Sequence, residues 1–235
     1  MNQTSMPVTF ITGTRKGLGR ALVEHYVRLG HAVAGCSREP IDWHLDGYVH
    51  YIADVADEQA VHAAFADVWF RYRRLDHLIN NAGIAAMNHS LLTPLSTLNR
   101  ILSTNVAGTF LVTREAAKLM KSANYGRIVN LTSVAVPLKL EGESAYAATK
   151  AAVNSLTDVL ARELAAFGIT VNGVGPTPVD TDLIRGIPKA KLERLLARQA
   201  IPRMATPEDV ANVIDFFVRP ESGFITGQTI YLGGV

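Results

Sequence analysis

The sequence of 235 residues contains one cysteine and no apolar run of membrane-spanning length. The one cysteine, Cys36, excludes a disulfide or a cysteine-based zinc site within a single chain, and its place in an expected strand favours a packed thiol. Residues 1–6 lack the basic start and the apolar run of a signal peptide. These absences predict a cytoplasmic protein with no membrane contact.

Charge and histidine spacing exclude further classes of partner. The formal net charge is +2 and the basic residues are dispersed, so we expect no nucleic-acid partner. No two histidines have the i, i+4 spacing with a nearby carboxylate that marks a metal-binding helix, so no metal site is predicted. The chain has no internal repeat or linker, and its 48% hydrophobic content suits one α/β domain over residues 1–235.

A strand, a glycine turn and a helix are present near the N-terminus. Residues 8–11 have the pattern of a buried strand, and residues 20–30 have apolar positions at helical spacing. The glycines of Thr12-Gly13-x-x-x-Gly17-x-Gly19 between them allow a tight turn and a close approach to a pyrophosphate, which the helix N-terminus favours. The spacing departs from G-x-G-x-x-G, so an ordinary strand-to-helix turn is the alternative.

Strands and helices then alternate in the order that a doubly wound sheet requires. The expected strands are residues 32–36, 49–52, 75–79, 127–131 and 228–232, and the expected helices lie near residues 18–29, 57–73, 94–120, 145–167 and 207–218. Ligands of such sheets bind beyond the carboxyl ends of the strands, where Ser37-Arg38, Asp54-Val55 and Asn80-Asn81-Ala82-Gly83 fall. The connection between the second and third strands is short, so no full helix is expected there.

A phenol and an ammonium lie at i and i+4 in Tyr146-Ala147-Ala148-Thr149-Lys150, on one face of an expected helix. A neighbouring cation stabilises a phenolate and lowers the pKa of tyrosine from about 10, so that Tyr146 can act as a general acid or base. An isolated pair of this kind is more often a surface pair. Here Ser133, at the end of the 127–131 strand, shares the nucleotide's edge of the sheet.

Taken jointly, these residues resemble the short-chain dehydrogenase/reductase family over essentially the whole chain. The matching pieces are Thr12-Gly13-x-x-x-Gly17-x-Gly19, Asp54, Asn80-Asn81-Ala82-Gly83, Asn105, Ser133, Tyr146, Lys150 and residues 172–181. The resemblance implies a Rossmann-type doubly wound sheet of about seven parallel strands, with helices on both faces.

The resemblance also implies a role for each site residue. Tyr146 would be the catalytic acid or base, and Ser133 would position the substrate oxygen. Lys150 would bind the nicotinamide ribose and lower the Tyr146 pKa, and Asn105 would hold a water that continues a proton relay. The residues expected to bind the cofactor are Gly13, Thr14, Arg15, Lys16, Gly17, Leu18, Gly19, Ser37, Arg38, Asp54, Val55, Asn81, Ala82, Gly83, Tyr146, Lys150, Pro176, Val179 and Thr181.

The end of the second strand predicts NADP(H) as the cofactor. NAD sites place an acidic residue there for the ribose 2′-hydroxyl, whereas this chain has Ser37-Arg38, with Arg15 and Lys16 in the glycine turn. Arginine matches the geometry of a phosphate. The alternative is that Arg15, Lys16 and Arg38 are solvated surface charges.

Residues 176–205 are polar and punctuated by proline, and we expect them to form a lid over the substrate, with a helical segment near residues 189–199. The expected apolar lining is Met87, Val136, Leu138, Leu140, Leu183 and Ile187. The basic lid residues could meet an acidic carrier protein or could be the solvated face of a helix; they are Arg185, Lys189, Lys191, Arg194 and Arg198. We expect His89, Glu141 and Glu143 to be solvated loop residues.

Two departures from the family pattern stand out. Thr177 replaces the glycine that usually follows Pro176, and its branched side chain is expected to narrow the pocket near the nicotinamide. Residues 232–235 lack the acidic residue that is usual in the final turn, which alters any C-terminal subunit contact.

The predicted function is NADPH-dependent reduction of a ketone. Within the family the chain looks most like 3-oxoacyl-carrier-protein reductases, so a small-molecule or carrier-protein-linked ketone is the expected substrate. Reduction of a sugar, polyol or polycyclic ketone is one alternative, and a catalytically silent nucleotide-binding sensor is another. Apolar residues such as Phe110, Val153 and Leu160 over a wide arc of two helices predict a homotetramer or a homodimer, as the family forms.

Overall fold

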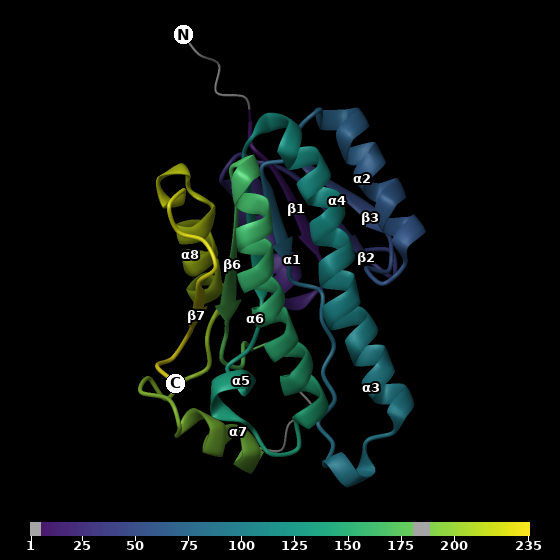
Figure 1. Ribbon diagram of the computed structural model, residues 1–235. Helices are drawn as coiled ribbons and strands as arrows, with labels where there is room; N and C mark the ends of the chain where they lie inside the picture. Colours follow the sequence, from purple (N-terminus) through teal and green to yellow (C-terminus); the bar gives the residue numbers. More distant parts are fainter. Residues whose placement is uncertain (1–5, 181–188) are drawn as a thin grey trace.

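Seven short runs of mainly apolar residues form one parallel sheet with the strand order β3-β2-β1-β4-β5-β6-β7 (Figure 1). The computed structural model describes residues 6–180 and 189–235. Every residue of β1, β4, β5 and β6 is buried, as a parallel sheet covered on both faces requires. The predicted doubly wound sheet is confirmed. The strands are β1 (Val8–Thr12), β2 (Ala32–Ser37), β3 (Tyr48–Ile52), β4 (His77–Asn80), β5 (Gly126–Leu131), β6 (Ile169–Gly175) and β7 (Thr229–Tyr231).

Helices cover both faces of the sheet (Figure 1). Apolar residues of the helices and strands form two core layers, one on each face. Alternate residues of β1 face opposite layers: Phe10 packs on Phe65, whereas Ile11 belongs to the layer of Leu22. The sheet is therefore a buried frame that fixes the positions of the strand ends. One face carries α2 (Glu58–Tyr72), α4 (Gly108–Ala123) and α6 (Ser144–Leu164), and the other carries α1 (Gly17–Arg28) and α8 (Pro207–Val218).

Two of the expected helices are not α-helical throughout. The helix expected over residues 94–120 consists of α3 (Leu95–Leu102), a π-helical turn η2 (Ser103–Ala107) and α4, and the helix over 145–167 ends in the 3₁₀ turn η3 (Ala165–Phe167). The connection between β2 and β3 contains no helix, as expected. No helix within residues 6–180 and 189–235 is long and apolar enough to cross a membrane. The other short helices in the described parts of the chain are η1 (Ser90–Leu92), α5 (Ala135–Leu138), α7 (Lys189–Leu196) and η5 (Pro220–Ser222).

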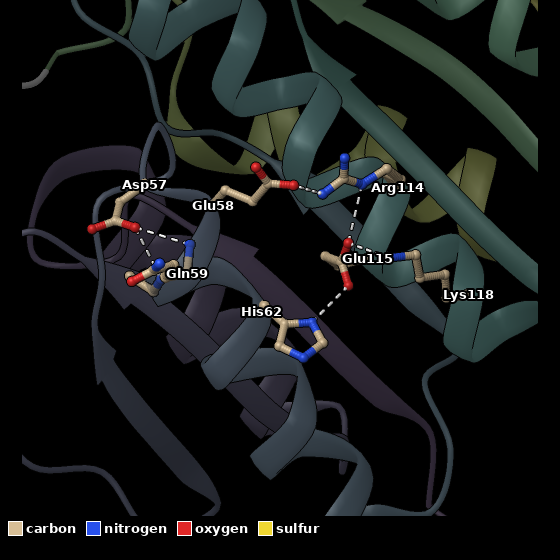
Figure 2. Close-up of polar contacts among 8 residues, drawn as sticks. Asp57, Glu58, Gln59, His62, Arg114, Glu115 and Lys118 are labelled. Carbon is tan, nitrogen blue, oxygen red and sulfur yellow. Dashed lines mark hydrogen bonds and ion pairs between the residues drawn. The ribbon is translucent and has the colours of Figure 1, made fainter.

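Charged side chains join α2 to α4 beside the core (Figure 2). Glu115 of α4 is buried, and its carboxylate accepts hydrogen bonds from Lys118 Nζ at 2.6 Å and Arg114 Nε at 3.1 Å, with His62 Nδ1 of α2 at 3.2 Å. Burial alone would raise the pKa of Glu115, but these hydrogen bonds outweigh it and hold the pKa below its ordinary value. Arg114 also reaches Glu58, at the start of α2, at 2.6 Å. The buried carboxylate is thus paired, and the pairing fixes α2 against α4.

A buried polar network holds α6 against the sheet. Asn80 Nδ2 donates to Thr113 Oγ1 at 2.8 Å and to Asn130 Oδ1 at 2.9 Å, which links β4 to α4 and β5. Asn130 Nδ2 donates to Thr157 Oγ1 of α6 at 2.9 Å, and that hydroxyl donates to Val153 O at 2.8 Å. Displacing α6 would leave buried polar groups unpaired, so the network specifies where the helix lies.

We expect Thr157→Val to lower the free energy of unfolding by about 1–3 kcal/mol, because it leaves a buried amide hydrogen of Asn130 unpaired. Thr170→Val is the matched control: Thr170 Oγ1 is also buried but has no hydrogen-bond partner among the described residues. This isosteric change should leave stability equal or raise it. Urea unfolding followed by circular dichroism measures both variants, and equal losses would contradict the role given to the network.

Candidate active site

The carboxyl ends of the parallel strands meet at one rim of the sheet, where the structure has a cavity of about 500 Å³. The strand order brings together residues that lie far apart in the sequence. Of the predicted site residues, the cavity lining includes Gly13, Arg15, Lys16, Gly17, Leu18, Gly19, Ser37, Arg38, Asp54, Val55, Asn81, Ala82, Gly83, Ser133, Tyr146, Lys150, Pro176 and Val179. Thr14 and Asn105 are buried and are not part of this lining, and Thr181 lies outside the described residues.

The glycine turn leaves no room for a side chain at Gly13 or at Gly19. Gly13 adopts a φ of 73°, in the left-handed region, and a Cβ on Gly19 would lie 2.1 Å from the Gly13 carbonyl oxygen. Asn81 Nδ2 donates to Thr12 O at 2.8 Å and to Gly13 O at 3.2 Å, which packs the turn against the end of β4. The resulting cradle, at the N-terminus of α1, fits the pyrophosphate of a dinucleotide.

Tyr146 lies in the first turn of α6, and its phenol is hydrogen-bonded with Ser133, the second residue after β5. Ser133 Oγ also accepts a hydrogen bond from Ala135 N at 3.1 Å, which fixes the hydroxyl. Burial raises the pKa of Tyr146 to about 12; the bond with Ser133 opposes this shift, and the Glu143 carboxylate adds to it. The phenol therefore keeps its proton at neutral pH and can donate it to a bound group.

Lys150 follows Tyr146 by one turn of α6, and its side chain is buried. Its Nζ donates to Leu131 O at 2.7 Å and lies 5.9 Å from the centroid of the Tyr146 ring. Burial lowers the pKa of Lys150 to about 8. Burial has the largest effect on the Tyr146 pKa in this structure, and the expected lowering of that pKa by Lys150 stays a prediction.

Asn105, on the π-helical turn η2, closes a set of hydrogen bonds behind the cavity. Its Oδ1 accepts from Ile84 N at 2.9 Å, and its Nδ2 donates to Ile84 O at 2.9 Å and to Thr149 Oγ1 at 3.0 Å. A Cβ on Gly83 would lie 3.4 Å from Lys150 Nζ and 3.5 Å from Asn105 Oδ1, so both groups face Gly83. Sequence reasoning missed Thr149, whose only signal is its place within the Tyr146 to Lys150 turn.

The far end of the cavity is rich in cations. Arg15 and Lys16 from the glycine turn and Arg38 from the end of β2 line the same cavity, and Arg15 forms an ion pair with Glu39. Beyond β3, Asp54 Oδ1 accepts a hydrogen bond from Ala56 N at 3.0 Å, which shapes the loop there. An anionic group such as a phosphate fits this end of the site.

Thr14 lies behind the glycine turn. Its side chain is fully buried, and its Oγ1 lies 2.6 Å from Tyr48 Oη and donates to Cys36 O at 3.3 Å. It thereby ties the glycine turn to β2 and β3. The side chain supports the cradle from behind, and the expected contact of Thr14 with the cofactor stays a prediction.

Thr177 borders the cavity, and the narrowing of the pocket expected from it stays a prediction. Its Oγ1 accepts a hydrogen bond from Gln199 Nε2 at 2.5 Å, and both residues are buried. Gln199 follows α7, and the next two residues, Ala200 and Ile201, donate backbone N–H groups to residues 233–234. The base of the 176–205 segment is thus tied to the end of β6 and to the C-terminal residues.

The mouth of the cavity matches part of the expected apolar lining. Met87 and Leu140 line it, as does Leu195 of α7, which the sequence did not single out. Val136 and Leu138 are not part of the lining. Leu183, Arg185 and Ile187 lie outside the described residues.

Polar residues at the mouth follow the expectation less closely. Glu143 lines the cavity and is partly buried, and burial raises its pKa, whereas Glu141 and His89 are exposed as expected. Arg198 donates to Leu138 O at 2.7 Å. The exposed basic side chains of α7 are Lys189, Lys191 and Arg194.

A larger cavity of about 1400 Å³ lies at the opposite, amino-end side of the sheet and contains none of the predicted site residues. Its acidic side chains already have partners: Asp76 pairs with Arg74, and Asp215 lies 2.8 Å from His25 Nε2. In the described parts of the chain, no three His, Cys, Asp or Glu side chains are grouped as metal ligands. Because ligands of open parallel sheets bind at the carboxyl ends, the smaller cavity is the candidate active site.

Comparisons with known proteins agree with this geometry. A family described as enoyl-(acyl carrier protein) reductase matches residues 13–234. The acetoacetyl-CoA reductase of Shinella zoogloeoides is 34% identical over 236 residues, covering 97% of each chain. The 3-oxoacyl-(acyl-carrier-protein) reductase of Aquifex aeolicus is 30% identical over 237 residues, covering 97% of this chain and 96% of that protein. A solved structure described as ElxO with NADP bound has a TM-score of 0.89 and 28% identity, covering 97% of each chain.

The lowered pKa of Lys150 predicts a pH-dependent stability. Between pH 8 and pH 10.5 the unfolded chain holds the Lys150 proton more tightly than the folded one, so raising the pH removes a cost of burial and stabilises the fold. Relative to Lys150→Met, the unfolding free energy of the wild type should rise by about 3 kcal/mol from pH 7 to pH 10.5. Urea unfolding at both pH values measures the difference, and parallel pH curves would contradict the assignment.

Proposed function

This chain belongs to the short-chain dehydrogenase/reductase family, and we propose that it reduces a ketone to a secondary alcohol with NADPH as the hydride donor. The observation that carries the proposal is the convergence of Ser133, Tyr146 and Lys150 with the glycine turn on one cavity. A protonated phenol, a fixed hydroxyl and a buried ammonium beside a dinucleotide cradle supply what carbonyl reduction requires.

Each residue then has a distinct part in the reaction. A ketone oxygen placed between Tyr146 and Ser133 would accept hydrogen bonds from both, and Tyr146 would transfer its proton to that oxygen. Bound NADPH would supply the hydride to the carbonyl carbon. Ser133 replaces solvent with a dipole that its bond from Ala135 N holds in place, and Lys150 stabilises the phenolate that remains. Asn105 faces Gly83 together with Lys150, and it would hold a water through which a proton returns to Tyr146.

Support for NADPH over NADH comes from the cationic end of the cavity. Arg38 follows β2 where an acidic residue would favour NAD, and Arg15 and Lys16 line the same space. The structure described as ElxO with NADP bound, which this chain resembles over 97% of its length, is consistent with this choice.

A 3-oxoacyl thioester, free or carried on a protein, is the substrate that we favour. Met87, Leu140 and Leu195 provide apolar surface at the mouth, which suits an acyl chain better than a polyol with many hydroxyl groups to pair. The names of the two relatives given above, an acetoacetyl-CoA reductase and a 3-oxoacyl-(acyl-carrier-protein) reductase, indicate substrates of this class. Lys189, Lys191 and Arg194 are exposed near the mouth and would meet an acidic carrier protein.

We further propose a homotetramer or homodimer. Val153 and Leu160, which the sequence predicts to lie on the outer apolar face, are buried in the protein's own core. Phe110 on α4 and Val159 on α6 are instead 42% and 49% exposed, so the outer faces of these helices keep apolar surface for a second copy.

Phe110→Arg should reduce the oligomer, because it places a charge in the apolar face that a second copy would bury. Phe70→Arg, on α2, is the control, since Phe70 is 72% exposed and lies on a different helix. Light scattering at micromolar protein reports the mass of each variant. A wild type that is a stable monomer would overturn the proposal.

The decisive experiment follows NADPH oxidation with an acetoacetyl group on a carrier protein, with the same group on a short thioester mimic, and with sugar and cyclic ketones. We expect the acyl substrates to be reduced fastest. Tyr146→Phe should keep NADPH binding, measured by fluorescence titration, but lose most turnover, because a proton donor typically contributes about 10²–10⁴-fold. Activity confined to sugar or cyclic ketones would eliminate the acyl substrate, and near-normal turnover in Tyr146→Phe would contradict the mechanism.

A further inference from the structure

The Glu39 carboxylate lies among the cations at the far end of the cavity. Glu39 follows Arg38 after the end of β2, and its side chain forms an ion pair with Arg15 of the glycine turn. Arg15, Arg38 and Glu39 all line the cavity. A group bound between the glycine turn and β2 therefore meets both the cations and this negative charge.

Backbone contacts hold the two partners of this ion pair close together. Ser37 Oγ donates to the Glu39 carbonyl oxygen at 2.7 Å, and His50 Nε2 of β3 lies 3.3 Å from the same oxygen. On the other side, Trp43 Nε1 donates to the Arg15 carbonyl oxygen at 3.0 Å, which fastens the 38–47 connection to the glycine turn. The pairing thus follows from how this connection folds.

Resting on the proposed use of NADPH, we propose that Glu39 is a specificity-determining residue that weakens the preference for NADPH over NADH. Its carboxylate occupies Arg15 as an internal counter-ion. To pair with Arg15, the 2′-phosphate of NADPH must displace the Glu39 carboxylate, and it then lies close to that negative charge. The 2′-hydroxyl of NADH is uncharged, so it is not repelled, and it can donate a hydrogen bond to the carboxylate.

The exposure of the pair sets the size of the effect. The Arg15 and Glu39 side chains are 47% and 59% exposed, and ion pairs in such surroundings are weak, so a phosphate can displace the carboxylate. Glu39 should therefore moderate the discrimination made by Arg15, Lys16 and Arg38 without abolishing it.

The test is a fluorescence titration of NADPH and NADH with wild type, Glu39→Gln, Arg15→Gln and the double variant, which requires no turnover. Glu39→Gln should bind NADPH about three- to fivefold more tightly and NADH no more tightly than wild type. In the Arg15→Gln background, Glu39→Gln should increase the affinity for NADPH by less than half as much, because the carboxylate and the phosphate no longer compete for Arg15. Glu58→Gln is the matched control, since Glu58 forms an exposed ion pair with Arg114 outside the cavity.

Weaker NADPH binding by Glu39→Gln would overturn the inference, because Glu39 would then position Arg15 for the phosphate. Unchanged NADPH binding would also overturn it, because Glu39 would then have no effect on how Arg15 binds the phosphate. A wild type that binds both dinucleotides, with a ratio that Glu39→Gln does not move, would overturn this inference alone. A wild type that binds neither dinucleotide would overturn both the inference and the proposed function.

Discussion

The reversal of strand order between β1 and β4 is the constraint on which the rest of the site depends. The chain passes from β1 to β2 and β3 on one side and continues from β4 on the other, so the loops that follow β1 and β4 diverge and leave a crevice. At the base of this crevice, the Asn81 side chain donates hydrogen bonds to Thr12 O and Gly13 O. The backbone N–H groups of Asn81 and Ala82 donate to Thr12 Oγ1 at 3.0 and 2.9 Å. This close approach is possible only because Gly13 and Gly19 carry no side chains.

Removal from water is the second constraint, and it acts on both ionisable groups at the centre of the site. Burial raises the pKa of Tyr146 and lowers the pKa of Lys150, so each is pushed toward its neutral form. The fold offsets part of this cost by directing Lys150 Nζ to Leu131 O. A phenol that retains its proton is suited to donate it, which is the direction that ketone reduction needs.

The parts of the molecule that could be predicted from the sequence are those that local patterns specify. The strands, the glycine turn and the Tyr146 to Lys150 spacing each depend on residues within a few positions of one another, and the sheet order then places them on one rim. The inward orientation of Thr14 and its contact with Tyr48 could not be predicted, nor could the bond between Thr177 and Gln199. Those partners are 34 and 22 positions apart, and their pairing depends on how irregular connections fold.

The same division explains why the reaction follows more directly from the structure than the substrate does. Ser133 follows the buried strand β5, and Lys150 of α6 is hydrogen-bonded to the last residue of that strand, Leu131, so both residues have little freedom of placement. The mouth is built from segments that lack this support and is held at a few points, such as the bond from Gln199 to Thr177 and the backbone pairing of residues 200–201 with 233–234. We expect substitutions there to change the shape and charge of the entrance without moving Lys150, whose Nζ is held by Leu131 O of β5. A fold of this kind can therefore keep one chemistry while its mouth comes to fit different ketones.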